Sequence, residues 1–166
     1  MSKNLFDRPI SAEIFFRFHL IHCERKIFLM KNQRVYEYRM KVPFHDLDPV
    51  QIVWHGNYLK YFDIARFGLF AEAGVDLYRY YQDTQYLFPV IKTSTKHIAS
   101  LTYGDEFVCK ATLAEAGIKI VIDFEIRRVK DNVICAKGRG EQVAVKMPEM
   151  QTMYEIPAEI RSALGF

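Results

Sequence analysis

The amino-acid sequence predicts an α+β domain in which one long helix lies across the concave face of a curved antiparallel sheet. Three observations lead to this fold class. An alternating, strand-like segment precedes a long apolar helix, four more strand-like segments follow that helix, and the connections between the later segments are short. One apolar helix and one sheet with an apolar face can bury each other, and 166 residues suffice for such a core.

The first strand and the helix have clear periodicities. In residues 35–42, VYEYRMKV, side chains alternate as they do in a half-buried strand. Residues 56–74, GNYLKYFDIARFGLFAEAG, predict a largely buried helix of about five turns that ends near Gly74. The apolar residues at helical spacing are Tyr58, Phe62, Ala65, Leu69 and Ala73.

Four later segments predict the other strands. They are residues 88–101, 106–113, 118–129 and 132–147, joined by the turn TYGD and the hairpin-sized connections AEAG and KD. In the last segment, Gly138 and Gly140 indicate a bulge or a close approach of the backbone. In the third, one face carries Ile118, Ile120, Ile122, Phe124 and Ile126.

The predicted domain occupies residues 33–150. We expect residues 1–32 to form a helical N-terminal extension, either packed on the domain or lying outside it. Residues 151–166 are expected to form a C-terminal tail with a short helix. The sequence therefore predicts one globular domain with two short flanking segments.

Composition argues against several classes of protein. A net charge of +3, with no basic run interleaved with aromatics, argues against a nucleic-acid partner. No apolar run reaches 18 residues, so we expect no membrane span, and the N-terminus lacks the cleavage site of a secretory signal. Cys23, Cys109 and Cys135 are odd in number and lack CxxC spacing, which is typical of free thiols in the cytoplasm.

The loop before the helix, FHDLDPVQIVWHGNY at residues 44–58, carries more ionisable groups than a turn requires. His45, Asp46, Asp48 and His55 lie within eleven residues of one another. A strand, then D-x-D-P, then V-W-H-G-N-Y at a helix start, and later Y-G-D at 103–105, resembles the hotdog-fold acyl-CoA thioesterases. The resemblance is strongest to the 4-hydroxybenzoyl-CoA thioesterase-like family and covers residues 35–148.

The resemblance implies a hotdog fold, in which the curved antiparallel sheet wraps around one long central helix. It implies hydrolysis of an acyl- or aroyl-CoA thioester to the free acid and CoA, without a cofactor, in a homodimer or homotetramer with sites at subunit interfaces. The catalytic carboxylate of the family matches Asp48, and a histidine of one branch matches His55. Two positions depart from the pattern: Phe44 stands where that branch has tyrosine, and Gln51 where relatives often have glycine.

Elementary chemistry agrees with these roles. Thioester hydrolysis needs a carboxylate that attacks the carbonyl or activates water, and donors for the developing oxyanion. We expect Asp48 to be the carboxylate and His55 to orient water or stabilise charge. A helix N-terminus offers free N–H groups and partial positive charge. The expected substrate-binding residues at this helix start are Trp54, Gly56, Asn57 and Tyr58.

Other interpretations of the loop remain open. Asp48-Pro49 can simply begin a turn, His55 can cap the helix or lie against Trp54, and Asp46 can be structural. Glu72 is a rival catalytic carboxylate, because another branch of hotdog thioesterases places one on the central helix. His97 is interpreted as a strand residue.

Other functions are also open. A metal site is not expected, since the spacing of the histidines and aspartates in the loop is not one that binds metals recognisably. The substrate could be carried by acyl-carrier protein instead of CoA. The protein could also be a non-catalytic hotdog protein that binds acyl-CoA.

Overall fold

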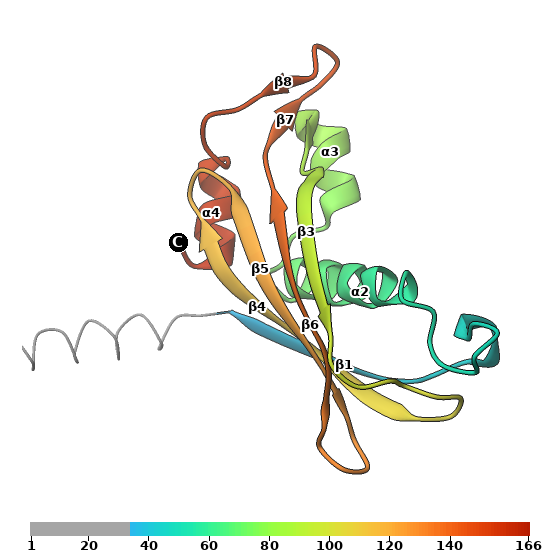
Figure 1. Cartoon of the computed structure of the whole chain (residues 1–166). Helices are drawn as coiled ribbons and strands as arrows, with labels where there is room; N and C mark the ends of the chain where they lie inside the picture. The colour runs from blue at the N-terminus through green and yellow to red at the C-terminus, as the bar shows by residue number, and fades with distance from the viewer. Residues whose placement is uncertain (1–33) are drawn as a thin grey trace, which may run out of the picture. The chain divides into compact units, whose positions relative to one another are not determined.

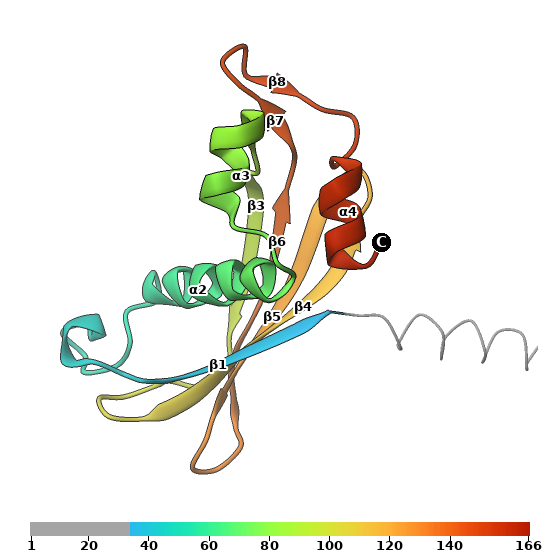
Figure 2. The same cartoon turned by 180° about the vertical axis from the view of Figure 1, so that it is seen from behind.

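A computed structural model describes residues 34–166, and the extension predicted for residues 1–32 lies outside them. Five strands form one antiparallel sheet in the order β1-β4-β5-β6-β3, and α2 lies across one face of it (Figures 1 and 2). The predicted α+β arrangement of a curved sheet and a long helix is confirmed. The main elements are β1 (Val35–Lys41), α2 (Asn57–Glu72), β3 (Val90–His97), β4 (Glu106–Ala116), β5 (Ile120–Arg128) and β6 (Ile134–Gln142).

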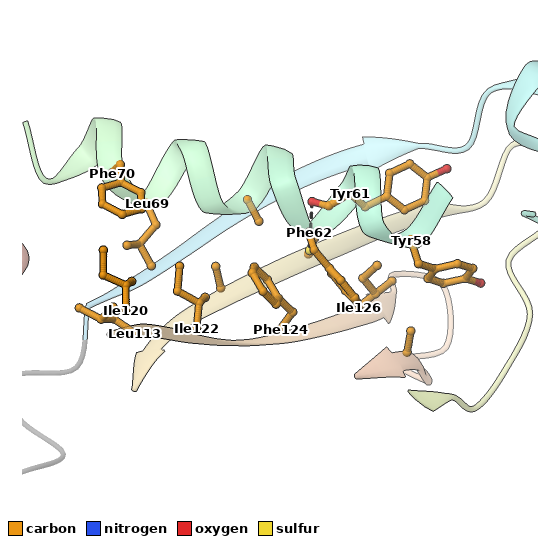
Figure 3. Close-up of a cluster of buried hydrophobic side chains, with 14 of the residues drawn as sticks. Tyr58, Tyr61, Phe62, Leu69, Phe70, Leu113, Ile120, Ile122, Phe124 and Ile126 are labelled. Carbon is orange, nitrogen blue, oxygen red and sulfur yellow. Dashed lines mark hydrogen bonds between the residues drawn. The ribbon is translucent and has the colours of Figure 1, made fainter. Parts of the chain in front are cut away.

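The core lies between α2 and the sheet. Figure 3 shows α2 side chains over those of β4 and β5, with the ring of Phe62 stacked on Phe124 at 4.8 Å between ring centroids. The helix ends at Glu72, and Gly74 follows with a φ of +79°, a left-handed conformation that glycine adopts without strain. The buried residues of the helix are Tyr58, Tyr61, Phe62, Ala65, Leu69 and Phe70.

The strands of the sheet differ in detail from the predicted segments. Ile118 is exposed in the turn between β4 and β5, whereas the alternation from Ile120 to Ile126 is buried as predicted. The segment 132–147 contains two strands, β6 and the short β7 (Val145–Lys146), and the segment 88–101 contains the shorter β3. Gly138 marks a close approach, since a Cβ there would lie 2.4 Å from the Phe62 ring.

A second, smaller group of elements adds to the main sheet; the helix α3 and a small second sheet were not foreseen, whereas α4 lies in the tail where a short helix was expected. The helix α3 (Leu77–Thr84) begins at Asp76, whose carboxylate accepts hydrogen bonds from two backbone N–H groups of its first turn. A three-stranded sheet joins β2 (Tyr86–Leu87), β7 and β8 (Gln151–Thr152). Near the C-terminus, α4 (Ala158–Leu164) contributes buried apolar side chains to the main core. None of the helices in residues 34–166 is long and apolar enough to cross a membrane.

Both edge strands of the main sheet, β1 and β3, have one partner strand each within residues 34–166, and β3 is the more exposed of the two. Seven of the eight residues of β3 are exposed. The opposite edge strand, β1, alternates between exposed and half-buried residues. An unpaired strand edge presents free backbone N–H and C=O groups to which another strand can bind.

We expect Gly138→Ala to destabilise the fold by about 2 kcal/mol, because the added methyl group must displace the stacked ring of Phe62. Chemical denaturation measures the effect. Gly117→Ala in the β4–β5 turn is the matched control, since a Cβ at Gly117 meets no atom within 4 Å. Equal stability changes in the two variants would contradict the close packing inferred at Gly138.

Candidate active site

A pocket of about 380 Å³ opens beside the start of α2. Three stretches of chain line it, and we call them the loop wall (residues 48–53), the helix wall (residues 55–58) and the strand wall (residues 97–100). Two of the predicted catalytic groups, Asp48 and His55, meet in this pocket. The lining residues are Asp48, Ile52, Val53, His55, Tyr58, His97, Ile98, Ala99 and Ser100.

Asp48 has two roles in the loop wall. Its Oδ1 accepts hydrogen bonds from the backbone N–H groups of Val50, at 2.8 Å, and Ile52, at 3.4 Å, so the carboxylate does hold a turn. No hydrogen bond within residues 34–166 uses its other oxygen, Oδ2. The side chain can therefore maintain the turn and still offer one carboxylate oxygen to a ligand in the pocket.

Asp46 is structural, in keeping with one of the interpretations above. It is 2% exposed, and its carboxylate accepts hydrogen bonds from Lys60 Nζ at 2.5 Å and from the Tyr61 hydroxyl at 2.6 Å. Its backbone carbonyl accepts two more, from Trp54 N–H and Asn57 Nδ2. Burial would raise the pKa of Asp46, but the hydrogen bonds from Lys60 and Tyr61 outweigh it and hold the pKa below its usual range.

The start of α2 lacks a side-chain cap among the described residues. The helix begins after Gly56, against which the Trp54 ring packs so closely that a Cβ would lie 2.2 Å from the ring. The His55 ring lies against Trp54, with 5.1 Å between ring centroids. Of the four residues predicted to bind substrate, Tyr58 lines the pocket, whereas Trp54, Gly56 and Asn57 shape the turn behind it.

The strand wall contains a residue that the sequence analysis did not place in the site. His97 is the last residue of β3, and its ring packs edge-to-face on Tyr58 with 4.7 Å between ring centroids. Burial raises the pKa of Tyr58 to about 12, so its phenol stays neutral. Because His97 lies 49 positions after Asp48 in the sequence, no local motif could have connected them.

The turn at Tyr103–Asp105 supports the strand wall. Gly104 has a φ of +78°, and the buried Asp105 carboxylate accepts hydrogen bonds from Thr102 N–H and Oγ1 and from Lys130 Nζ. Thr102 bridges to Ile52, and Leu101 O accepts a hydrogen bond from Val53 N–H. The turn thereby ties the strand wall to the loop wall.

The family of the chain follows from a comparison with family models. Residues 42–164 match the model of the thioesterase-like superfamily. The chain belongs to this superfamily. Among curated proteins, none matches the sequence.

Solved structures agree with the fold of this superfamily. A 1,4-dihydroxy-2-naphthoyl-CoA thioesterase from Synechocystis is similar over 78% of this chain and 95% of its own, with 18% identity and a TM-score of 0.73. The 4-hydroxybenzoyl-CoA thioesterase from Pseudomonas sp. strain CBS-3 is similar over 78% and 99%, with 20% identity and a TM-score of 0.72. The predicted hotdog fold is confirmed.

Both departures from the thioesterase pattern have a structural account. Gln51 has a φ of +65°, so the loop keeps a left-handed turn that glycine would adopt without strain. Phe44 is 69% exposed and packs edge-to-face on Tyr103, with 6.0 Å between ring centroids. Neither side chain lines the pocket.

Two alternatives fit the geometry poorly. Glu72 is the exposed last residue of α2, about 22 Å along the helix axis from Asn57, and it does not line the pocket. No group of three or more His, Cys, Asp or Glu side chains in residues 34–166 is arranged to hold a metal ion. Asp48 is the carboxylate in the lining of the pocket, which opens beside the helix start.

Asp46→Asn should cost about 2 kcal/mol of folding free energy at pH 7, because Lys60 and the Tyr61 hydroxyl lose a charged acceptor. Since the folded-state pKa is lowered, the contribution of Asp46 is present above the unfolded pKa of about 3.9 and is lost as the pH falls through the folded-state value. Urea denaturation at pH 7 and at pH 3 measures this difference.

The matched control for this measurement is Asp63→Asn, which removes an exposed carboxylate of α2 paired with Arg66 and should change stability little. The stability gap between wild type and Asp46→Asn is expected to shrink in acid. A gap of the same size at both pH values would show that the charge of Asp46 is not what stabilises the loop.

Proposed function

We propose that this protein hydrolyses an acyl- or aroyl-CoA thioester to the free acid and CoA, with Asp48 as the reacting carboxylate. The observation that carries the proposal is the meeting of Asp48 with the uncapped start of α2 in one pocket. Membership of the thioesterase-like superfamily supports the reaction class. The similar structures that act on 4-hydroxybenzoyl-CoA and 1,4-dihydroxy-2-naphthoyl-CoA support CoA as the carrier.

The pocket suits the two halves of the reaction. The Asp48 oxygen that makes no hydrogen bond within residues 34–166 attacks the thioester carbonyl or takes a proton from the attacking water. Negative charge then develops on the carbonyl oxygen, and the N–H groups of Gly56 and Tyr58 and the helix dipole stabilise it, whereas the Asn57 N–H already donates to Trp54 O. His55, on the same wall, orients the water or stabilises this charge.

The lining of the pocket suits an acyl or aroyl group. Ile52, Val53, Ile98 and Ala99 present apolar surface, and the Tyr58 ring adds an aromatic face. The volume of about 380 Å³ lies in the range of small-molecule sites. The free, buried thiols of Cys109 and Cys135 suit a reducing compartment, and we place the protein in the cytoplasm.

Thiol release from a panel of acyl- and aroyl-CoA esters tests the function. We expect Asp48→Asn to lower kcat at least about 100-fold, because the amide neither attacks the carbonyl nor accepts a proton from water. Glu72→Gln, which changes an exposed carboxylate at the far end of α2, should retain wild-type activity. Circular dichroism and thermal melting establish that both variants are folded.

The remaining outcomes separate the alternatives. Activity that survives Asp48→Asn would overturn the assignment of the carboxylate, and loss in Glu72→Gln alone would transfer the role to Glu72. A wild-type protein that releases no thiol from CoA esters would be tested on acyl-carrier-protein thioesters. If it then only binds acyl-CoA in calorimetry, the non-catalytic interpretation holds.

We further propose that the protein forms a homodimer through the open edge of β3. The exposed face of β3 and its free backbone groups support this mode of pairing. The strand ends at His97, so the partner would lie next to the strand wall of the pocket. A tetramer would need a second contact between such dimers.

Ser94→Glu tests the dimer, because Ser94 lies near the middle of β3 and a twofold pairing would bring two carboxylates close together. We expect light scattering to show a shift from dimer to monomer, with the stability of the monomer unchanged. Ser162→Glu, at an exposed serine of α4, is the control. A dimer in both variants would place the interface elsewhere.

A further inference from the structure

The strand wall of the pocket has a chemical group that the proposed hydrolysis has not yet used. His97 is exposed, and its imidazole nitrogens make no hydrogen bond or ion pair within residues 34–166. The edge of its ring is held by Tyr58, at 4.7 Å between ring centroids. The side chain is thus positioned by packing while its nitrogens remain free for a ligand.

The geometry of the tetrahedral intermediate limits which of its substituents can lie beside the strand wall. A tetrahedral intermediate has four substituents at carbon: the attacking oxygen, the oxyanion, the acyl group and the sulfur. The attacking oxygen belongs beside Asp48 on the loop wall, and the oxyanion belongs beside the N–H groups of the helix wall. The strand wall remains for the leaving sulfur or the acyl group.

His97 carries the imidazole of the strand wall, and imidazole is the side chain that most often acts as a general acid. The hydroxyl of Ser100 does not have this chemistry. The neighbouring phenol of Tyr58 keeps its proton, since burial raises its pKa to about 12. Protonation assists the departure of an alkyl thiolate, because an alkyl thiol such as that of cysteine has a pKa of about 8.5 and its anion is a more basic, poorer leaving group than the anion of an acidic aryl thiol.

We propose that His97 is the general acid that protonates the leaving thiolate, an inference that rests on the proposed thioesterase function. As the carbon–sulfur bond breaks, its electron pair goes to sulfur, and the imidazolium N–H of His97 gives its proton to that sulfur. The carbonyl carbon keeps its new bond to the attacking oxygen. Water supplies the oxygen and both protons of the net reaction, so the products are the acid and the thiol.

The role of His97 differs from that of His55. The His55 ring lies against Trp54 beside the helix start, on the wall assigned to the oxyanion. His97 approaches from a different element, the end of β3, and from a different wall. The two histidines therefore act on different atoms of the intermediate, and substitution of each should have a different dependence on the leaving group.

Two thioesters of one acyl group test the proposal. One releases N-acetylcysteamine, an alkyl thiol, and the other releases 4-nitrothiophenol, which is far more acidic and leaves without protonation. We expect His97→Gln to lower kcat about 100-fold on the alkyl thioester, with KM little changed, and to leave the aryl thioester nearly unaffected. His45→Gln, at an exposed histidine outside the pocket, should match wild type on both.

A second variant separates chemistry from packing. His97→Phe keeps an aromatic ring against Tyr58 but carries no proton, so it should show the same dependence on the leaving group as His97→Gln. Full activity of His97→Phe, or equal losses on both thioesters in His97→Gln, would reduce His97 to a structural or binding residue and overturn the proposal. A wild-type protein that hydrolyses neither ester, and no thioester of CoA or of acyl-carrier protein, would instead overturn the thioesterase function itself.

Discussion

The candidate site depends on a carboxylate that does not line it. Asp46 joins the loop to α2 through Lys60 and Tyr61, and its carbonyl joins the loop to the residues before the helix. A buried carboxylate is costly unless donors surround it, so the loop can close only in a conformation that supplies them. Leu47 pairs with Val53 inside this closed loop. The position of Asp48 relative to the helix start follows from that closure.

The two aspartates of the D-x-D motif therefore meet two different requirements, which a single carboxylate could not meet together. A carboxylate fully satisfied by a lysine and a tyrosine holds the backbone firmly, but its oxygens are occupied. A reacting carboxylate needs an oxygen without a strong donor. One carboxylate oxygen of Asp48 accepts hydrogen bonds within its own turn, and the other has no donor among residues 34–166. The spacing keeps the fixed carboxylate and the one proposed to react on the same loop.

Sequence periodicity predicted the elements that bury a continuous apolar face, such as α2 and β5. It missed α3, which has no fully buried residue, although Asp76 was a readable N-cap signal. The site was predictable where it is local, from Asp48 to Tyr58. His97 was interpreted as an ordinary strand residue, because only the packing of β3 beside the helix brings it into the pocket. Trp54 was expected to contact substrate, yet its ring turns onto Gly56.

The first turns of α2 set the geometry between the loop wall and the strand wall. Tyr61 holds the loop through Asp46, and Tyr58, packed edge-to-face on Tyr61 at 6.1 Å, holds His97. Both tyrosines are buried against the sheet, so neither can move without disturbing the core. The pairing of β3 with β6, which ends with His97 opposite Ala136, fixes the same residue from the side of the sheet. The helix and the sheet together thus set the positions of Asp48 and His97, which lie 49 positions apart in the sequence, in the lining of the pocket.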